Sequence, residues 1–169
     1  MYSTINDMDQ ITNNIWLGNY SSASNIDNLK NQGINNILCV MDTRPPAYKK
    51  EDNMNQKIIN VADSPVQNII KHFGESLNFI EGKDKILVHC MAGASRSATV
   101  VIAYIMWKEK KSFEEALGIV SKKRPCAFPN IGFRKQLKEF EKKLMENNYD
   151  LNRINFKEII WKPKLSQLW

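Results

Sequence analysis

The sequence contains few of the residues that build disulfide frameworks and metal sites. Its 169 residues include three cysteines, Cys39, Cys90 and Cys126, and two histidines, His72 and His89. An odd and sparse set of cysteines argues against a disulfide framework and for a reducing compartment. No group of cysteines and histidines has the spacing of a metal site, so we do not expect zinc. No other metal and no organic cofactor is implied.

Long hydrophobic runs are also missing. No apolar stretch approaches the length that spans a bilayer. Residues 1–5 lack the layout of a secretory signal and a glycine for myristoylation, and residues 165–169 contain no cysteine to prenylate. We therefore expect a chain without a membrane anchor that acts in the cytoplasm, with the nucleus also open to it.

The charged residues form no dominant block. The formal net charge of +6 favours anionic partners through long-range attraction. The basic residues occur as short pairs, such as Lys49-Lys50 and Lys142-Lys143, with acidic residues between them. No basic stripe with interleaved aromatic residues is present, so we do not expect nucleic-acid binding.

Strand and helix patterns alternate along the chain and predict a single α/β domain. We expect a strand pair over 11–17 with its bend at Asn13-Asn14, and strands over 34–40, 57–61 and 85–89. Helices are expected over 24–32, 69–80, 97–108 and 131–145, and Ser112 with Glu115 predicts a capping box that opens one more. This order indicates a central, mostly parallel sheet of four to five strands flanked by helices. The domain is expected over 10–148, between an extension over 1–9 and a basic extension over 149–169 whose structure stays open.

Residues 88–97 carry the strongest chemical signal. They read Val-His-Cys-Met-Ala-Gly-Ala-Ser-Arg-Ser and join a predicted strand to a predicted helix. A tight loop that enters a helix at the carboxyl end of a strand gathers backbone N–H groups that bind an anion such as phosphate. Gly93 permits a positive φ in such a turn, and the small neighbouring side chains let phosphate approach the backbone. The residues expected to bind phosphate are Met91, Ala92, Gly93, Ala94, Ser95 and Arg96.

Cys90 lies at the start of this loop. The N–H groups and the helix dipole would stabilise a thiolate there, and a thiolate is a strong nucleophile. Arg96 offers a planar fork for two phosphate oxygens, and Ser97 can donate its hydroxyl to the Cys90 sulfur. Each residue alone is common in a core or on a surface, but their joint spacing predicts catalysis.

The motif His89-Cys90-x-x-Gly93-x-x-Arg96-Ser97 resembles the signature loop of the protein tyrosine phosphatase superfamily, and its Ala-Gly-x-Ser-Arg-Ser ending resembles the dual-specificity phosphatases. The likeness continues in Ile-Thr-x-x-Ile-Trp-Leu-Gly at 11–18, Arg-Pro at 124–125 and Pro-Asn-x-Gly-Phe-x-x-Gln-Leu at 129–137. The resemblance implies a two-step mechanism, in which Cys90 forms a phosphocysteine that water then hydrolyses.

A general acid is also implied, because the leaving oxygen must be protonated. The family carries an aspartate in a loop just past an upstream strand, and Asp63 fits that place better than Asp42 does. A turn or helix-cap role for Asp63 stays open. His89 is implied to hold the loop and tune the thiolate by hydrogen bonding, and Asn130 to brace the loop, although core roles for both also stay open.

The uncharged loop bears on the substrate. Relatives that act on phosphoinositides tend to carry lysines in this loop, whereas Met91, Ala92, Ala94 and Ser95 are uncharged. The tyrosine-specific relatives are longer, and their extra loops deepen the pocket. The resemblance therefore implies a shallow pocket here, which admits phosphoserine and phosphothreonine as well as phosphotyrosine on protein partners. Two alternatives stay open: a phosphatase of phosphoinositides or other non-protein substrates, and a catalytically silent phosphoprotein-binding module.

Cys39 has two interpretations. In a lipid-phosphatase relative, a cysteine on the matching strand forms a reversible disulfide with the nucleophile, so the resemblance suggests a Cys39–Cys90 disulfide. The simpler interpretation is a small core residue. The target phosphoprotein, the oligomeric state and the role of the tail with Trp161 and Trp169 are not predicted.

Overall fold

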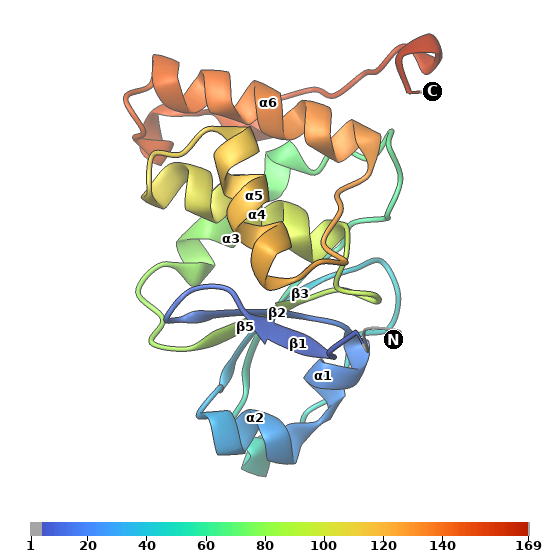
Figure 1. The fold of residues 1–169 in the computed structure, drawn as a ribbon, viewed down its shortest axis with the longest axis vertical. Helices are drawn as coiled ribbons and strands as arrows, with labels where there is room; N and C mark the ends of the chain where they lie inside the picture. The colour runs from blue at the N-terminus through green and yellow to red at the C-terminus, as the bar shows by residue number, and fades with distance from the viewer. Residues whose placement is uncertain (1–4, 169) are drawn as a thin grey trace.

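The computed structural model describes residues 5–168 and contains one five-stranded sheet with helices on both faces (Figure 1). The strands are β1 (Met8–Gln10), β2 (Ile15–Gly18), β3 (Asn36–Val40), β4 (Asn55–Ile59) and β5 (Ile86–His89), in the spatial order β1-β2-β5-β3-β4. Only β1 runs antiparallel to its neighbour. The predicted α/β fold with a mostly parallel sheet in a single domain is confirmed.

The helices cover the two faces unequally. Two short helices, α1 (Tyr20–Ser24) and α2 (Ile26–Gln32), lie on one face, and the other face carries α3 (Phe73–Ile80), α4 (Arg96–Lys108), α5 (Phe113–Lys123) and α6 (Ile131–Glu146) (Figure 1). Nearly every residue of α4 is buried, as expected for a helix that is apolar all round. The main core therefore lies between the sheet and α4, with a smaller cluster under α2.

Several element boundaries differ from the predicted ones. Residues 11–14 form the turn between β1 and β2, because Ile11 N–H bonds the Ile15 carbonyl at 2.8 Å. The first strand of the predicted pair therefore lies at Met8–Gln10, on a polar sheet edge without apolar alternation. β4 lies two residues earlier than predicted, since its pairing with β3 ends at Ile59. Helix α1, which was not predicted, begins where the Asn19 side chain accepts a hydrogen bond from Ser22 N–H.

The segment after α6 folds back on the domain. Leu151, Ile154 and Phe156 are buried in the main core, and turns of 3-10 helix occur at Leu151–Arg153, Phe156–Glu158 and Leu165–Gln167. Residues 151–156 of the predicted tail thus pack against the helices that cover the sheet, and the chain then runs on toward its C-terminal end (Figure 1). Residues 1–4 of the predicted N-terminal extension, and Trp169, lie outside the described residues.

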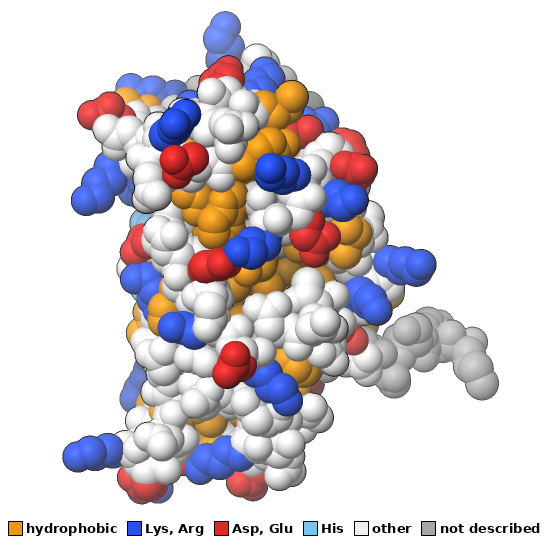
Figure 2. All heavy atoms as spheres, turned by 90° about the vertical axis from the view of Figure 1, so that its left-hand side faces the viewer, with side chains coloured by type: hydrophobic (Ala, Val, Ile, Leu, Met, Phe, Trp, Pro, Cys, Tyr) orange, Lys and Arg blue, Asp and Glu red, His pale blue; other side chains and the backbone are white. Residues whose placement is uncertain are grey.

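The charged side chains are mixed over the surface. Figure 2 shows the side of the molecule away from the carboxyl ends of the parallel strands, where basic and acidic side chains intersperse around a stripe of hydrophobic ones. This agrees with the short basic pairs and interleaved acids of the sequence. Within residues 5–168, no helix combines the length and the apolar composition needed to cross a bilayer.

Candidate active site

The loop predicted to bind phosphate lies at the carboxyl end of β5, the central strand. β5 pairs with β2 and β3, ends at His89, and is followed by α4, which begins at Arg96. Gly93 has a φ of +65°, and a Cβ on it would lie 2.5 Å from the Gly18 backbone. Only glycine satisfies both conditions. Residues 91–95 therefore form the turn before α4, and Arg96 is the first residue of that helix. We call residues 91–96 the phosphate loop, and their contact with phosphate stays a prediction.

Cys90 and Ser97 face each other across this turn. Cys90 is almost fully buried, and its Sγ lies 3.0 Å from Ser97 Oγ. Ser97 occupies the first turn of α4, whose N-terminal end carries partial positive charge. The hydroxyl and the helix end both favour negative charge on the sulfur.

His89 contacts the backbone of Cys90. It is fully buried, and its Nδ1 lies 3.1 Å from the Cys90 carbonyl oxygen. Burial lowers the pKa of His89 to about 4, against the opposing effect of that hydrogen bond. The imidazole is therefore neutral near pH 7, and Nδ1–H donates to the carbonyl. This geometry fits the predicted role of holding the loop.

Arg96 is bound to two groups from neighbouring segments. Its Nη1 donates to Asp42 Oδ1 at 2.8 Å and to the Val61 carbonyl at 3.1 Å. Its buried Nε has no hydrogen-bond partner among the described residues. Asp42, the weaker candidate for the acid, thus binds one side of the Arg96 guanidinium. The Nε donor of Arg96 remains unused.

Asn130 joins three parts of the site. Its Nδ2 donates to Asp63 Oδ1 at 2.9 Å, and its backbone N–H donates to Ser95 Oγ at 3.0 Å. Its Oδ1 caps α6 by accepting from Phe133 N–H at 2.9 Å. Contact with the phosphate loop was expected of Asn130, whereas contact with Asp63 was not. Asp63 itself is exposed in the loop after β4.

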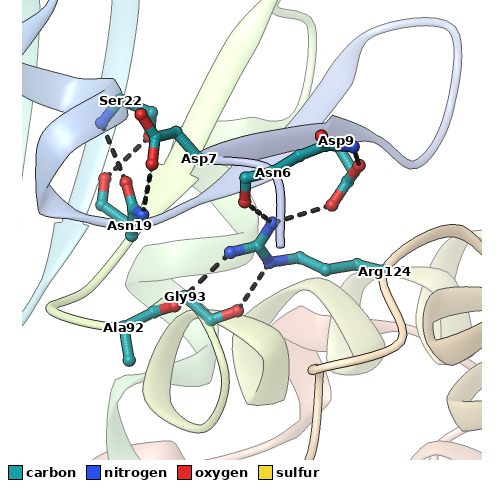
Figure 3. Close-up of polar contacts among 8 residues, drawn as sticks. All are labelled: Asn6, Asp7, Asp9, Asn19, Ser22, Ala92, Gly93 and Arg124. Carbon is teal, nitrogen blue, oxygen red and sulfur yellow. Dashed lines mark hydrogen bonds and ion pairs between the residues drawn. The ribbon is translucent and has the colours of Figure 1, made fainter. Parts of the chain in front are cut away.

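Arg124, for which no individual role was predicted, lies fully buried behind the phosphate loop (Figure 3). Its Nε donates to the Gly93 carbonyl at 2.8 Å and its Nη2 to the Ala92 carbonyl at 3.4 Å. Its Nη1 donates to Asp9 Oδ2 at 2.7 Å and to the Asn6 carbonyl at 2.8 Å. Because the peptide unit is planar, holding these carbonyls on one side directs the N–H groups of the same units to the other.

The cysteines of the described residues are free thiols. Cys39 pairs in register with His89 across β3 and β5, which brings it close to Cys90. Burial and, to a smaller extent, the charge of Cys90 raise the pKa of Cys39 to about 12. Within residues 5–168, no three His, Cys, Asp or Glu side chains gather as a metal site would require. The Cys39–Cys90 disulfide stays a prediction.

The chain is similar to known proteins over most of its length. Residues 15–143 match the family described as dual specificity phosphatase, catalytic domain. The chain is 42% identical to dual specificity protein phosphatase 22 of Mus musculus over 139 residues, covering 80% of this chain and 74% of that protein. It is 37% identical to dual specificity protein phosphatase 22-B of Danio rerio over 166 residues, covering 92% and 89%.

Solved structures show the same likeness. The human tyrosine phosphatase-like serine/threonine/tyrosine-interacting protein superposes with a TM-score of 0.77 at 36% identity, over 82% of this chain and 97% of that one. DUSP15 superposes with a TM-score of 0.72 at 34% identity, over 82% and 95%. The family match runs from β2 into α6, so it includes Asp42, Asp63, the phosphate loop, Arg124 and Asn130.

Proposed function

This chain belongs to the dual specificity phosphatase family and is a cysteine-based dual-specificity protein phosphatase, and we propose that Cys90 is its nucleophile and Arg96 its phosphate clamp. The observation that carries this assignment is the 3.0 Å approach of Ser97 Oγ to Cys90 Sγ at the start of α4. A hydroxyl in that position favours negative charge on the sulfur, which both the attacking and the departing thiolate need.

In the first step, Cys90 Sγ attacks phosphorus, a P–S bond forms, and the bond from phosphorus to the leaving oxygen breaks. The loop N–H groups and the free donors of Arg96 stabilise the charge on the equatorial oxygens. Asp63 gives its proton to the leaving oxygen, so that the alcohol or phenol departs neutral.

In the second step, water attacks the phosphorus and the P–S bond breaks. Asp63, now a carboxylate, accepts a proton from this water. Ser97 donates a hydrogen bond to the departing sulfur, which leaves as a thiolate. Inorganic phosphate is released, and both Cys90 and Asp63 return to their starting states.

Asp63 is the better-placed acid of the two candidates. Both aspartates are exposed, but Asp42 Oδ1 is paired with the Arg96 guanidinium, whereas Asp63 Oδ1 accepts from the neutral amide of Asn130. We expect Asp63→Asn to lower kcat/KM by about 10²- to 10⁴-fold, most for substrates whose leaving alcohol is a weak acid. Asp42→Asn should instead raise KM, and kcat/KM should depend on the acidity of the leaving alcohol as it does in the parent. The reverse pattern would assign the acid to Asp42.

Apolar side chains border the phosphate loop and support a protein substrate. Met91 is 48% exposed in the loop itself, and Phe128, 61% exposed, is tied to the loop by a bond from its N–H to the Ala94 carbonyl. Such side chains suit the flanks of a phosphorylated residue in a polypeptide better than the extra phosphates of an inositol head group. Phosphorylated proteins are therefore the proposed partners, and nucleic acids are not. The free thiols suit the reducing cytoplasm or nucleus.

Phosphate release by the purified chain tests the function. The substrates are a phosphotyrosine peptide, a phosphothreonine peptide and a soluble phosphoinositide, with Cys90→Ser as the blank. We expect release from both peptides and none in the blank. Release from the phosphoinositide alone would overturn the substrate class, and no release from any substrate would favour the phosphoprotein-binding module.

A further inference from the structure

The loop that carries Asp63, residues 60–69, has little support from the sheet, and we call it the acid loop. It follows β4, whose pairing with β3 ends at Ile59, and it runs to the 3-10 turn at Ile70–His72. Its own backbone hydrogen bonds are short-range, from Ser64 N–H to the Ala62 carbonyl and from Gln67 N–H to the Ser64 carbonyl, each 3.0 Å. The position of Asp63 therefore depends on contacts from elsewhere in the chain.

Helix α6 supplies one side of that support. Gln136 Nε2 donates to the Gln67 carbonyl at 2.9 Å, and Gln136 Oε1 accepts from Ile69 N–H at 2.9 Å. Gly132 lies against Pro65 so closely that a Cβ on the glycine would fall 2.0 Å from the Pro65 carbonyl oxygen. The loop thus rests on the first two turns of α6.

The C-terminal segment supplies the other side. Trp161 Nε1 donates to the Pro65 carbonyl at 2.8 Å, two residues after Asp63. In the opposite direction, Asn68 Nδ2 donates to the Ile159 carbonyl at 2.7 Å. Two side-chain-to-backbone bonds therefore join the acid loop to residues 159–161, one donated from each segment.

This part of the C-terminal segment is itself well anchored. Phe156 is buried, its ring centroid lies 6.0 Å from that of Phe140, and a Cβ on Gly74 would fall 2.7 Å from its ring. Leu151 and Ile154 are buried beside it. Trp161 follows this anchor by five residues, and its indole N–H links the anchored segment to the Pro65 carbonyl.

We propose that Trp161 is a positioning residue for the general acid, and that its indole N–H holds the Pro65 carbonyl so that Asp63 stays within reach of the leaving oxygen. The inference rests on the proposed role of Asp63. A proton donor must stay within hydrogen-bond reach of the oxygen it protonates, and small displacements cost rate. The C-terminal segment is then part of the catalytic apparatus, although it contains no group that touches the substrate.

The test compares two tryptophans in the full-length chain. Trp161→Phe keeps an aromatic ring and removes the indole donor. Trp107→Phe removes the same kind of bond, from Nε1 to the Tyr149 carbonyl at 3.0 Å. Trp107 lies near the far end of α4, about 16 Å along the helix from Arg96, so this control loses an equivalent bond away from the acid loop.

The measurement is kcat/KM for phenyl phosphate and for 4-nitrophenyl phosphate, because kcat/KM reports the steps up to phosphocysteine formation. The ratio compared among variants is kcat/KM for phenyl phosphate divided by kcat/KM for 4-nitrophenyl phosphate. Phenolate is the poorer leaving group and depends more on the acid. We expect Trp161→Phe to lower kcat/KM about fivefold for phenyl phosphate, the effect of one hydrogen bond, and less than twofold for 4-nitrophenyl phosphate. Trp107→Phe should leave the ratio between the two substrates unchanged.

Asn68→Ala removes the other bond between the loop and the C-terminal segment and should shift the ratio in the same direction. Equal ratios in the parent, Trp161→Phe and Trp107→Phe would overturn the inference and leave the phosphatase function standing. The inference would also fail if Trp107→Phe shifted the ratio as much as Trp161→Phe, because the effect would then follow from general loosening. A parent chain inactive on both substrates would instead refute the proposed function.

Discussion

Asn130 Nδ2 donates a 2.9 Å hydrogen bond to Asp63 Oδ1, while the backbone N–H of the same residue donates to Ser95 Oγ at 3.0 Å. One residue at the start of α6 therefore contacts both the acid loop and the phosphate loop. This shared contact helps to fix the proposed proton donor relative to the loop that is predicted to bind phosphate. Arg96 makes a second link between the two loops, because its Nη1 donates to the Val61 carbonyl, two residues before Asp63.

Asn130→Ser isolates the contact with Asp63. Serine caps a helix about as well as asparagine, and the backbone N–H to Ser95 is kept, so only the amide donor is lost. We expect kcat/KM for phenyl phosphate to fall about tenfold, with the melting temperature close to that of the parent. In an Asp63→Asn background the same change should cost less than twofold, because the two residues act as a unit. Effects that multiply fully in the double variant would contradict this coupling.

The sequence predicted the parts of the site that are contiguous in the chain. Cys90, Arg96 and Ser97 lie within eight residues, so a strand end, a turn and a helix start suffice to bring them together. The acid required the family resemblance, because Asp63 is ordinary as a turn residue. The contacts of Arg124 with Asp9 and of Trp161 with Pro65 join residues 115 and 96 positions apart. No local pattern encodes such pairs.

Some fold details were missed for a related reason. β1 is a polar strand of three residues, and its position follows from pairing with β2 rather than from its own composition. The C-terminal segment has no regular periodicity, since it packs through isolated residues such as Phe156 and Trp161. The positions of these segments are determined by tertiary contacts rather than by intrinsic secondary-structure propensity.

Arg124→Met tests the buried guanidinium behind the phosphate loop. The variant leaves the Asp9 carboxylate and the carbonyls of Ala92 and Gly93 without their donor. Breaking a buried ion pair from one side typically costs about 3–5 kcal/mol, and we expect that loss in the free energy of unfolding measured with urea. Arg153→Met removes an exposed ion pair with Asp150 and should change the free energy of unfolding by about 0.5 kcal/mol or less. Equal losses in the two variants would refute the role of Arg124.

Oxidation separates the two interpretations of Cys39. A disulfide requires attack by the Cys39 thiolate on an oxidised Cys90. Burial, the largest cause, keeps the pKa of Cys39 raised even when oxidation removes the charge of Cys90, so little thiolate is present at neutral pH. We therefore expect hydrogen peroxide to convert Cys90 to sulfenic and then sulfinic acid, with reduction of the peroxide to water, while Cys39 stays a free thiol. Mass mapping after alkylation measures both sites. A Cys39–Cys90 disulfide as the main product would favour the regulatory interpretation instead.

His89 should make stability depend on pH in the acid range. Burial lowers its pKa to about 4 in the folded chain, against about 6.5 for an unfolded histidine. Between these values the unfolded state binds more protons, so the free energy of unfolding rises with pH in this window and the contribution is complete above it. On account of this residue, the chain should be about 2 kcal/mol less stable at pH 5 than at pH 7.

The control for this pH effect is His89→Asn, because the asparagine amide can replace the Nδ1 donor to the Cys90 carbonyl and does not titrate. Every other titrating group, including His72, is common to both proteins. Urea unfolding at pH 5 and pH 7 should therefore show the stability difference between parent and variant shrinking by about 2 kcal/mol at the lower pH. A difference that stays constant would mean that His89 has the same pKa in the folded and the unfolded chain, and the conclusion that burial keeps the imidazole neutral would be wrong.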